Sequence, residues 1–274
     1  MRVILAEVRC SPGQMDENID RIEKCIEASP DADLIAFPEL FLSGYNIGDR
    51  LHMLALTPQR KEVARLKKLA AKNGLWLLVG APYVNPLRRG ETLNAALLIG
   101  PKGQLHLQGK RFLPTFGPFE EGRLFSPAED RDVFPTPFGK VGLLICYEAF
   151  FPEVTRQLAL NGADLFMVIS ASLMTSRSLF EKVLPARAVE NSTPLIFVNR
   201  MDVEDNLVFG GGSAAWDPRG EQMRPEITEI EGLGRLLLYD LPLEDYRFYR
   251  PMRPVLRDVA SAGRNRTSPA APGK

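Results

Sequence analysis

Histidine and cysteine are scarce in this chain of 274 residues, which has two histidines and three cysteines. The histidines lie in segments without the features of a catalytic loop, so a histidine-activated nucleophile is not expected. The cysteines, Cys10, Cys25 and Cys146, are far apart and form no CxxC pair, which argues against a disulfide framework or a zinc site. The sequence therefore predicts no metal centre and a reducing, cytoplasmic setting.

The chain also lacks an excess of charge of either sign, because Lys+Arg and Asp+Glu both number 34. This balance gives no reason to expect nucleic acid or an anionic membrane as a partner. No apolar run approaches the roughly 20 residues of a membrane span, and the apolar stretch at the N-terminus is too short for a signal peptide. We therefore expect a globular protein whose partners include neither nucleic acid nor membrane.

Strand-like and helical patterns alternate along the chain. Short apolar runs typical of buried strands are "RVILAEV", "LIAFPEL", "LWLLVGAPYV", "VGLLIC", "ADLFMVIS" and "PLIFVNR". Apolar residues at helical spacing, with capping residues, predict helices over 15–28, 57–73, 152–160 and 179–191. The segment 115–131 has no clear period and is predicted to be a loop. This alternation predicts one α/β domain with a mixed sheet over 1–257, followed by a polar tail, 258–274, that is flexible at its end.

Three polar residues stand at the ends of strand-like runs: Glu39 in "FPEL", Lys110 in "GKRFLP" and Cys146 in "LLICYE". The strand ends of an open α/β sheet are where ligands bind. A thiolate can attack an electrophilic carbon, a carboxylate can carry the proton, and an ammonium can stabilise the negative charge that develops on oxygen. By residue type alone, a cysteine ending an apolar strand is more often an inert buried thiol.

The three stretches together resemble the motifs of the nitrilase superfamily of carbon–nitrogen hydrolases. That family has a Glu in a strand-end "PE" motif, a Lys in a "K-x-x-L" motif and a Cys in a "G-x-x-x-C-x-(D/E)-x-x-x-P-E" motif. The chain has "FPEL", "KRFLP" and "GLLICYEAFFPE" in the same order, and "ARAVENSTPLIFVNR" is similar to the helix and strand that follow. The resemblance covers about 2–254 and outweighs the reading of Cys146 as inert.

The resemblance implies an αββα sandwich with two mixed β-sheets, assembled as a homodimer or a higher homo-oligomer, and no cofactor. It implies hydrolysis of a C–N bond other than a peptide bond, in a small-molecule amide or nitrile, through a cysteine thioester. By the same resemblance, Cys146 is the nucleophile and Glu39 is the general base. Lys110 and the backbone N–H of Tyr147 would then stabilise the oxyanion.

Further site residues are less sharply marked. "FEEGRLF" resembles the family's loop with a second acidic residue, with Glu121 in register and Glu120 as the neighbouring alternative; its implied role is to orient the substrate amide or assist the base. Other residues could contact the substrate, the aromatic ones as an apolar pocket and the arginine as a carboxylate ligand. They are Tyr45, Phe116, Phe150, Phe151 and Arg177. Core packing and a solvated arginine explain these residues as well.

The substrate remains open at this point. Nitrilases proper commonly have Trp after the cysteine, so Tyr147 favours an amide, and dicarboxylate monoamides are among the candidates. Carbamoylases tend to have basic residues shortly after the cysteine, where this chain has "AFF". The alternatives are therefore a nitrilase, an N-carbamoyl-amide hydrolase, and a catalytically silent binding protein that keeps the fold.

Overall fold

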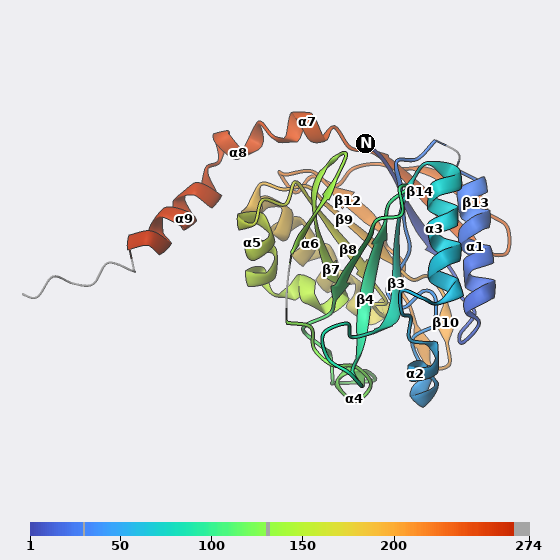
Figure 1. The fold of residues 1–274 in the computed structure, drawn as a ribbon. Helices are drawn as coiled ribbons and strands as arrows, with labels where there is room; N and C mark the ends of the chain where they lie inside the picture. The colour runs from blue at the N-terminus through green and yellow to red at the C-terminus, as the bar shows by residue number, and fades with distance from the viewer. Residues whose placement is uncertain (30, 130–131, 266–274) are drawn as a thin grey trace, which may run out of the picture.

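The computed structural model describes every residue except 30, 130–131 and 266–274. Two β-sheets pack face to face, with helices on both outer sides (Figure 1). The larger sheet has the strand order β13-β14-β1-β2-β3-β4-β5, and the smaller has the order β12-β9-β8-β7-β6. Helices α1 and α3 cover the larger sheet, whereas α5 and α6 cover the smaller one. The expected αββα sandwich with two mixed sheets is confirmed.

The bounds of the elements are as follows. The larger sheet contains β1 (Arg2–Val8), β2 (Leu34–Ala36), β3 (Trp76–Val84), β4 (Thr92–Ile99), β5 (Leu105–Gly109), β13 (Glu226–Ile230) and β14 (Gly234–Asp240). The smaller sheet contains β6 (Val133–Thr136), β7 (Gly139–Ile145), β8 (Leu165–Ser170), β9 (Leu195–Asn199) and β12 (Ala214–Trp216). A separate hairpin is formed by β10 (Val203–Glu204) and β11 (Leu207–Val208). The longer helices are α1 (Met15–Glu27), α3 (Lys61–Asn73), α5 (Pro152–Leu160), α6 (Arg177–Asn191) and α9 (Val255–Asn265). Single turns are η1 (Gly48–Arg50), α2 (Leu51–Leu54), α4 (Glu121–Leu124), η2 (Cys146–Phe150), η3 (Met174–Ser176), α7 (Leu243–Tyr246) and α8 (Tyr249–Met252).

Strand direction brings several strand ends to one edge of the sandwich. Strands β1, β2 and β3 are mutually parallel, as are β7, β8 and β9. Because β4 is antiparallel to both β3 and β5, β5 runs in the same direction as β3. The residues that follow β2 and β5 therefore emerge at the same edge of the larger sheet.

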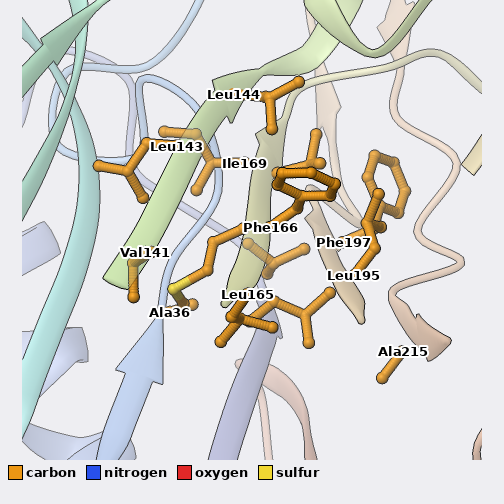
Figure 2. Close-up of a cluster of buried hydrophobic side chains, with 14 of the residues drawn as sticks. Ala36, Val141, Leu143, Leu144, Leu165, Phe166, Ile169, Leu195, Phe197 and Ala215 are labelled. Atoms are coloured by element: carbon orange, nitrogen blue, oxygen red, sulfur yellow. The ribbon is translucent and has the colours of Figure 1, made fainter. Parts of the chain in front are cut away.

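The core of the sandwich follows the two-residue period of its strands. On β1, Val3 and Leu5 belong to the cluster between the sheets, whereas Ile4 and Ala6 belong to the cluster under α1 and α3. Figure 2 shows part of the first cluster, in which Ala36 of β2 lies among side chains of the smaller sheet. The labelled side chains of the smaller sheet are Val141, Leu143, Leu144, Leu165, Phe166, Ile169, Leu195, Phe197 and Ala215.

Two local predictions need correction. The helix predicted from 57 begins at Lys61, because Leu56 is hydrogen-bonded along β3 and Arg60 is still extended. The same helix ends at Asn73, and Gly74 takes the left-handed conformation (φ 65°), as the "NG" signal indicates. The predicted loop 115–131 contains one helical turn, α4.

The C-terminal helices α7, α8 and α9 run from the sandwich toward its α5 side and beyond it (Figure 1). Helix α9 contacts α5 and α6. Residues 258–265, the first part of the predicted polar tail, are helical, and 266–274, which include the end predicted to be flexible, lie outside the described residues. Within the part of the chain that the structure describes, no helix combines the length and apolarity needed to cross a bilayer.

Candidate active site

Glu39, Lys110 and Cys146 meet at the edge of the sandwich where β2, β5 and β7 end. Lys110 follows β5 directly, Cys146 follows β7 directly, and Glu39 comes three residues after β2. The Lys110 ammonium donates a hydrogen bond to Glu39 Oε1 at 2.6 Å, and both side chains are fully buried. Residues far apart in the sequence therefore form one site, with Cys146 contributed by the smaller sheet and the other two residues by the larger one.

Cys146 occupies a sharp turn from strand to helical turn. Its φ is +50°, which is uncommon for a residue other than glycine. The turn η2 begins at this residue, immediately after Ile145, the last residue of β7. The first backbone N–H groups of a helical turn have no carbonyl partner within that turn. The N–H of Tyr147, the second residue of η2, is one of these groups.

Glu148 ties this turn to the strand that carries the lysine. Its two carboxylate oxygens accept hydrogen bonds from the backbone N–H of Ile145 at 2.9 Å and of Arg111 at 2.7 Å. Since Arg111 directly follows Lys110, one buried carboxylate fixes the positions of both the nucleophile and the lysine. The sequence motif contains this residue, but its positioning role was not predicted.

Glu121 completes the charged cluster. Lys110 Nζ donates to Glu121 Oε1 at 2.7 Å, and the Tyr45 hydroxyl donates to the same oxygen at 2.6 Å. Glu121 is buried at the start of α4, whereas Glu120 is exposed and pairs with Arg123. Of the two glutamates left open by the sequence, the structure places Glu121 in the site.

Two further residues hold the carboxylates through three hydrogen bonds, and neither residue was predicted. Asn94 Nδ2 donates to Glu39 Oε1 at 2.7 Å and to Glu121 Oε2 at 3.2 Å. The backbone N–H of Ala171, just after β8, donates to Glu39 Oε2 at 2.9 Å. A signal for Asn94 exists in the sequence, because "TLNAALLI" is an apolar strand with one uncharged amide in its interior. Such a buried amide requires polar partners.

Burial and charge decide which groups of the cluster are ionised. Burial raises the pKa of the Cys146 thiol, and the negative charge of Glu39 raises it further, while Lys110 opposes the rise. Burial alone would lower the pKa of Lys110, but Glu121 and Glu39 outweigh it and raise that pKa. Burial also raises the pKa of Glu121, opposed by Lys110. The resting site therefore contains a firmly charged ammonium and a thiol that needs a base.

The loop that carries Tyr45 is held from behind by the β10–β11 hairpin. Glu204 Oε1 accepts hydrogen bonds from the backbone N–H groups of Tyr45 at 3.0 Å and Asn46 at 2.6 Å. The other carboxylate oxygen of Glu204 pairs with the fully buried guanidinium of Arg200 at 2.6 Å. This buried ion pair sets the position of the Tyr45 hydroxyl on Glu121.

Aromatic rings connect the two sides of the site. Phe119 lies 5.9 Å from Tyr45 and 6.1 Å from Phe116, measured between ring centroids. Phe116 in turn lies 5.2 Å from the ring of Tyr147, which follows the nucleophile. Phe116 is 53% exposed, so part of this aromatic arc (Tyr45, Phe119, Phe116 and Tyr147) faces solvent. The structure therefore places Tyr45 and Phe116 beside the site.

Two further candidate substrate contacts, Phe150 and Phe151, also reach the ring of Tyr147, at 6.0 and 5.0 Å between centroids. Phe150 packs edge-on against Phe180 at 4.9 Å, and Phe151 stacks on Phe112 at 3.9 Å. Arg177 is exposed and pairs with Glu181 on the next turn of α6 at 3.0 Å. Phe150 and Phe151 thus pack against core aromatic rings, and Arg177 has an ion-pair partner on the surface.

Among the described residues, no group of three or more His, Cys, Asp or Glu side chains is placed to hold a metal ion. The carboxylates of the site are instead bound by Lys110, Asn94 and Tyr45.

Comparisons with known proteins agree with this geometry. The model of the family described as carbon-nitrogen hydrolase matches residues 5–251. The nitrilase of Pyrococcus abyssi is 32% identical over 86% of this chain and 90% of its own length. The (R)-stereoselective amidase of a Pseudomonas species is 30% identical over 84% of both chains. A cysteine-to-alanine variant of the amidase from Nesterenkonia sp. AN1, solved in complex with butyramide, matches with a TM-score of 0.79 and 30% identity over 97% of this chain and 96% of its own. These matches cover nearly the whole chain, which therefore belongs to the carbon–nitrogen hydrolase family and is an enzyme of the nitrilase superfamily.

Proposed function

We propose that the enzyme hydrolyses small amides to a carboxylic acid and ammonia through a thioester on Cys146. The observation that carries this proposal is the buried Lys110, which bridges Glu39 and Glu121 next to the thiol. Such a cluster is costly to bury and supplies a base, an anion-stabilising group and a nucleophile in one place. The similarity to an amidase that was solved with butyramide supports a small amide as substrate.

The first chemical step is acylation. Glu39 accepts the thiol proton of Cys146, and the thiolate attacks the amide carbonyl. A lysine ammonium has three N–H donors, and the hydrogen bonds of Lys110 to Glu39 and Glu121 use two of them. The third donor and the backbone N–H of Tyr147 stabilise the tetrahedral oxyanion.

The second step is collapse of this intermediate and hydrolysis of the thioester. The C–N bond breaks, and Glu39 gives its proton to the nitrogen, which leaves as ammonia. Glu39 then removes a proton from water, the resulting hydroxide attacks the thioester, and the C–S bond breaks to release the acid. The departing thiolate of Cys146 takes the proton back from Glu39, which restores the starting enzyme. Glu121, held by Tyr45 and Lys110, orients the amide nitrogen of the substrate and keeps the ammonium aligned.

The rival substrates differ in the polar groups they require. An N-carbamoyl acid or a dicarboxylate monoamide needs a cation for its carboxylate, and the candidate Arg177 is exposed and paired with Glu181. A nitrile has no NH2 group for Glu121 to orient. Ammonia release should therefore be measured for butyramide, butyronitrile, a succinic acid monoamide and an N-carbamoyl amino acid. Turnover of the simple amide alone supports the proposal, whereas no turnover of any of these would favour a silent binding protein.

The mechanism has a direct test. Brief exposure of the enzyme to the best amide, followed by acid quenching and mass spectrometry, should show the acyl mass on the peptide that contains Cys146. Cys146→Ala should remove both the adduct and the activity while the protein stays folded. Glu39→Gln should reduce kcat by about 10²–10⁴-fold. An adduct on Cys10 or Cys25 instead, or activity of the alanine variant near wild type, would reject this mechanism.

We further propose that the enzyme is a cytoplasmic homodimer or higher homo-oligomer that pairs through the α5 and α6 face. Exposed apolar side chains on this face and on the neighbouring α9 support a covered surface; they are Leu160, Leu179 and Val259. The three free cysteines suit a reducing compartment. Light scattering should give at least twice the monomer mass, and Leu160→Asp with Leu179→Asp should reduce it. A monomeric wild type would contradict the pairing.

A further inference from the structure

Asn94 is a buried side chain whose carbonyl oxygen has no partner. Its Oδ1 is one of the few buried side-chain atoms of the described residues for which no hydrogen bond is found. Buried polar atoms are almost always paired, so an exception at the edge of an active site calls for a functional reason. Strand β4 carries this residue into the interior with no exposed surface.

The orientation of this amide is fixed by its neighbours. Its NH2 group lies between Glu39 Oε1 at 2.7 Å and Glu121 Oε2 at 3.2 Å. Turning the amide over would place Oδ1 against two carboxylates, which repel it and offer no donor. The unpaired oxygen is therefore the consequence of placing two neutral N–H donors between the two acidic groups.

We propose that Asn94 is a positioning residue that keeps Glu39 aligned as the base while Lys110 stabilises the oxyanion. The proposal rests on the proposed function. Glu39 Oε1 accepts from both Lys110 and Asn94. When charge develops on the substrate oxygen, the ammonium is attracted toward it and its hydrogen bond to Glu39 weakens. The neutral amide has no such competing attraction, so its hydrogen bond to the carboxylate persists throughout the step.

Other groups around Glu39 cannot take over this role. The charged or titratable groups that face it are Lys110 after β5, Glu121 on α4, Tyr45 on the preceding loop and Cys146 on η2. Among the described residues, the remaining donor to Glu39 is the Ala171 N–H, and it binds the opposite carboxylate oxygen, Oε2. Loss of the Asn94 donor would remove a hydrogen bond that favours the ionised form of the base. The acid limb of the pH profile of kcat/KM should therefore move to higher pH.

The test compares Asn94→Ala with Asn191→Ala. Asn191 is also fully buried, donates one hydrogen bond to a backbone carbonyl and has an unpaired Oδ1, but it lies on α6 among residues outside the charged cluster. Asn94→Ala should reduce kcat by roughly 10- to 100-fold, less than removal of the base itself, with a smaller change in KM. Asn191→Ala should keep the wild-type kcat and pH profile. Asn94→Ser, which retains one donor, should be intermediate and serves if the alanine variant fails to fold.

A second readout does not depend on the substrate. The rate at which iodoacetamide alkylates Cys146, followed by peptide mass spectrometry against pH, reports removal of the thiol proton by Glu39. The acid limb of this alkylation profile should move to higher pH in Asn94→Ala and stay in place in Asn191→Ala. If amides are hydrolysed but neither limb moves, the positioning role is wrong and the proposed function stands. If no amide is hydrolysed but the alkylation limb moves, the positioning role stands and the proposed function fails.

Discussion

Gly80 of β3 lies directly against the backbone of Glu39. A Cβ atom added at Gly80 would come within 2.4 Å of the Pro38 carbonyl oxygen and 2.6 Å of Glu39 Cα. The Gly80 N–H also donates to that carbonyl at 3.2 Å. The segment that carries the proposed base therefore reaches its position because β3 has no side chain at this point.

Replacement of Gly80 by alanine should displace Glu39 and impair catalysis. The atoms in the way are backbone, so the segment from Pro38 to Leu40 must shift, and a displacement of about 1 Å in a catalytic group can cost about 10²-fold in rate. Steady-state kinetics should show this loss mainly in kcat. The matched control is Gly100→Ala, whose new Cβ would have side-chain atoms of Gln104 and Trp76, and no backbone atom, as its three nearest neighbours. Equal losses in both variants would contradict the positional explanation.

Removal of the ammonium should leave two buried carboxylates without their cation. Lys110→Met should abolish activity and lower the free energy of unfolding at pH 7 by about 3–5 kcal/mol. The deficit should shrink toward pH 5, because protonation of a carboxylate removes the uncompensated charge. Urea unfolding of Lys110→Met and wild type at pH 5 and pH 7 measures this loss of unfolding free energy. The exposed pair of Lys61 with Asp16 provides the comparison, since Lys61→Met should cost at most about 1 kcal/mol.

The titration of Glu121 should appear in the pH dependence of stability. Burial raises its pKa in the folded protein above the usual 4.5, and Lys110 opposes the rise. A carboxyl group with a raised folded pKa contributes stability that is complete below the unfolded value and is lost as the pH rises through the folded value. From pH 4.5 to 7, the unfolding free energy of Glu121→Gln should therefore rise relative to wild type. The exposed Glu120 should show no such trend in Glu120→Gln, and parallel curves for both variants would contradict the assignment.

Loss of the ion pair between Glu204 and Arg200 should affect catalysis through the loop that carries Tyr45. In Glu204→Gln the amide can still accept from the Tyr45 N–H but loses its ion pair with the buried Arg200, which keeps Asp202 as a partner at 2.6 Å. We expect a loss of about 2 kcal/mol in unfolding free energy and a fall in kcat of about 10-fold, because the Tyr45 hydroxyl orients Glu121. Glu62→Gln is the control, since Glu62 is also a buried glutamate paired with an arginine, on α3. Glu62→Gln should lose stability but keep the wild-type kcat.

Much of the fold was predictable because nearby residues in the sequence mark where its helices and strands begin and end. Helix α5 runs over the predicted residues, from the N1 proline Pro152 to the residue before "NG", and β1 also has the predicted bounds. The start of α3 was not predictable, because Leu56 pairs with Tyr83 of β3, and no local pattern reveals a contact 27 positions away. Neither was the helical character of 258–265, which the small polar residues of the tail did not suggest.

The site was predictable to the extent that its residues stand in motifs. Glu39, Lys110 and Cys146 end strands in ordered motifs, and the fold brings them together. Asn94 was missed because it lies inside a strand. A buried amide at such a position more often forms hydrogen bonds with polar groups of the core than with a catalytic residue. The Glu204 contact was missed for a different reason, since it joins the loop to a hairpin 159 positions away.

The division of the site between two sheets has a consequence for heating and for core substitutions. The nucleophile belongs to the smaller sheet and the base to the larger one, so the apolar layer around Ala36 and Leu143 acts as the spacer that sets their separation. A slight slip of one sheet over the other would part thiol from carboxylate while every strand stayed hydrogen-bonded to its neighbours. On heating, activity should therefore be lost several degrees below the unfolding midpoint. The difference between these two temperatures would measure how rigidly the two sheets pack against each other.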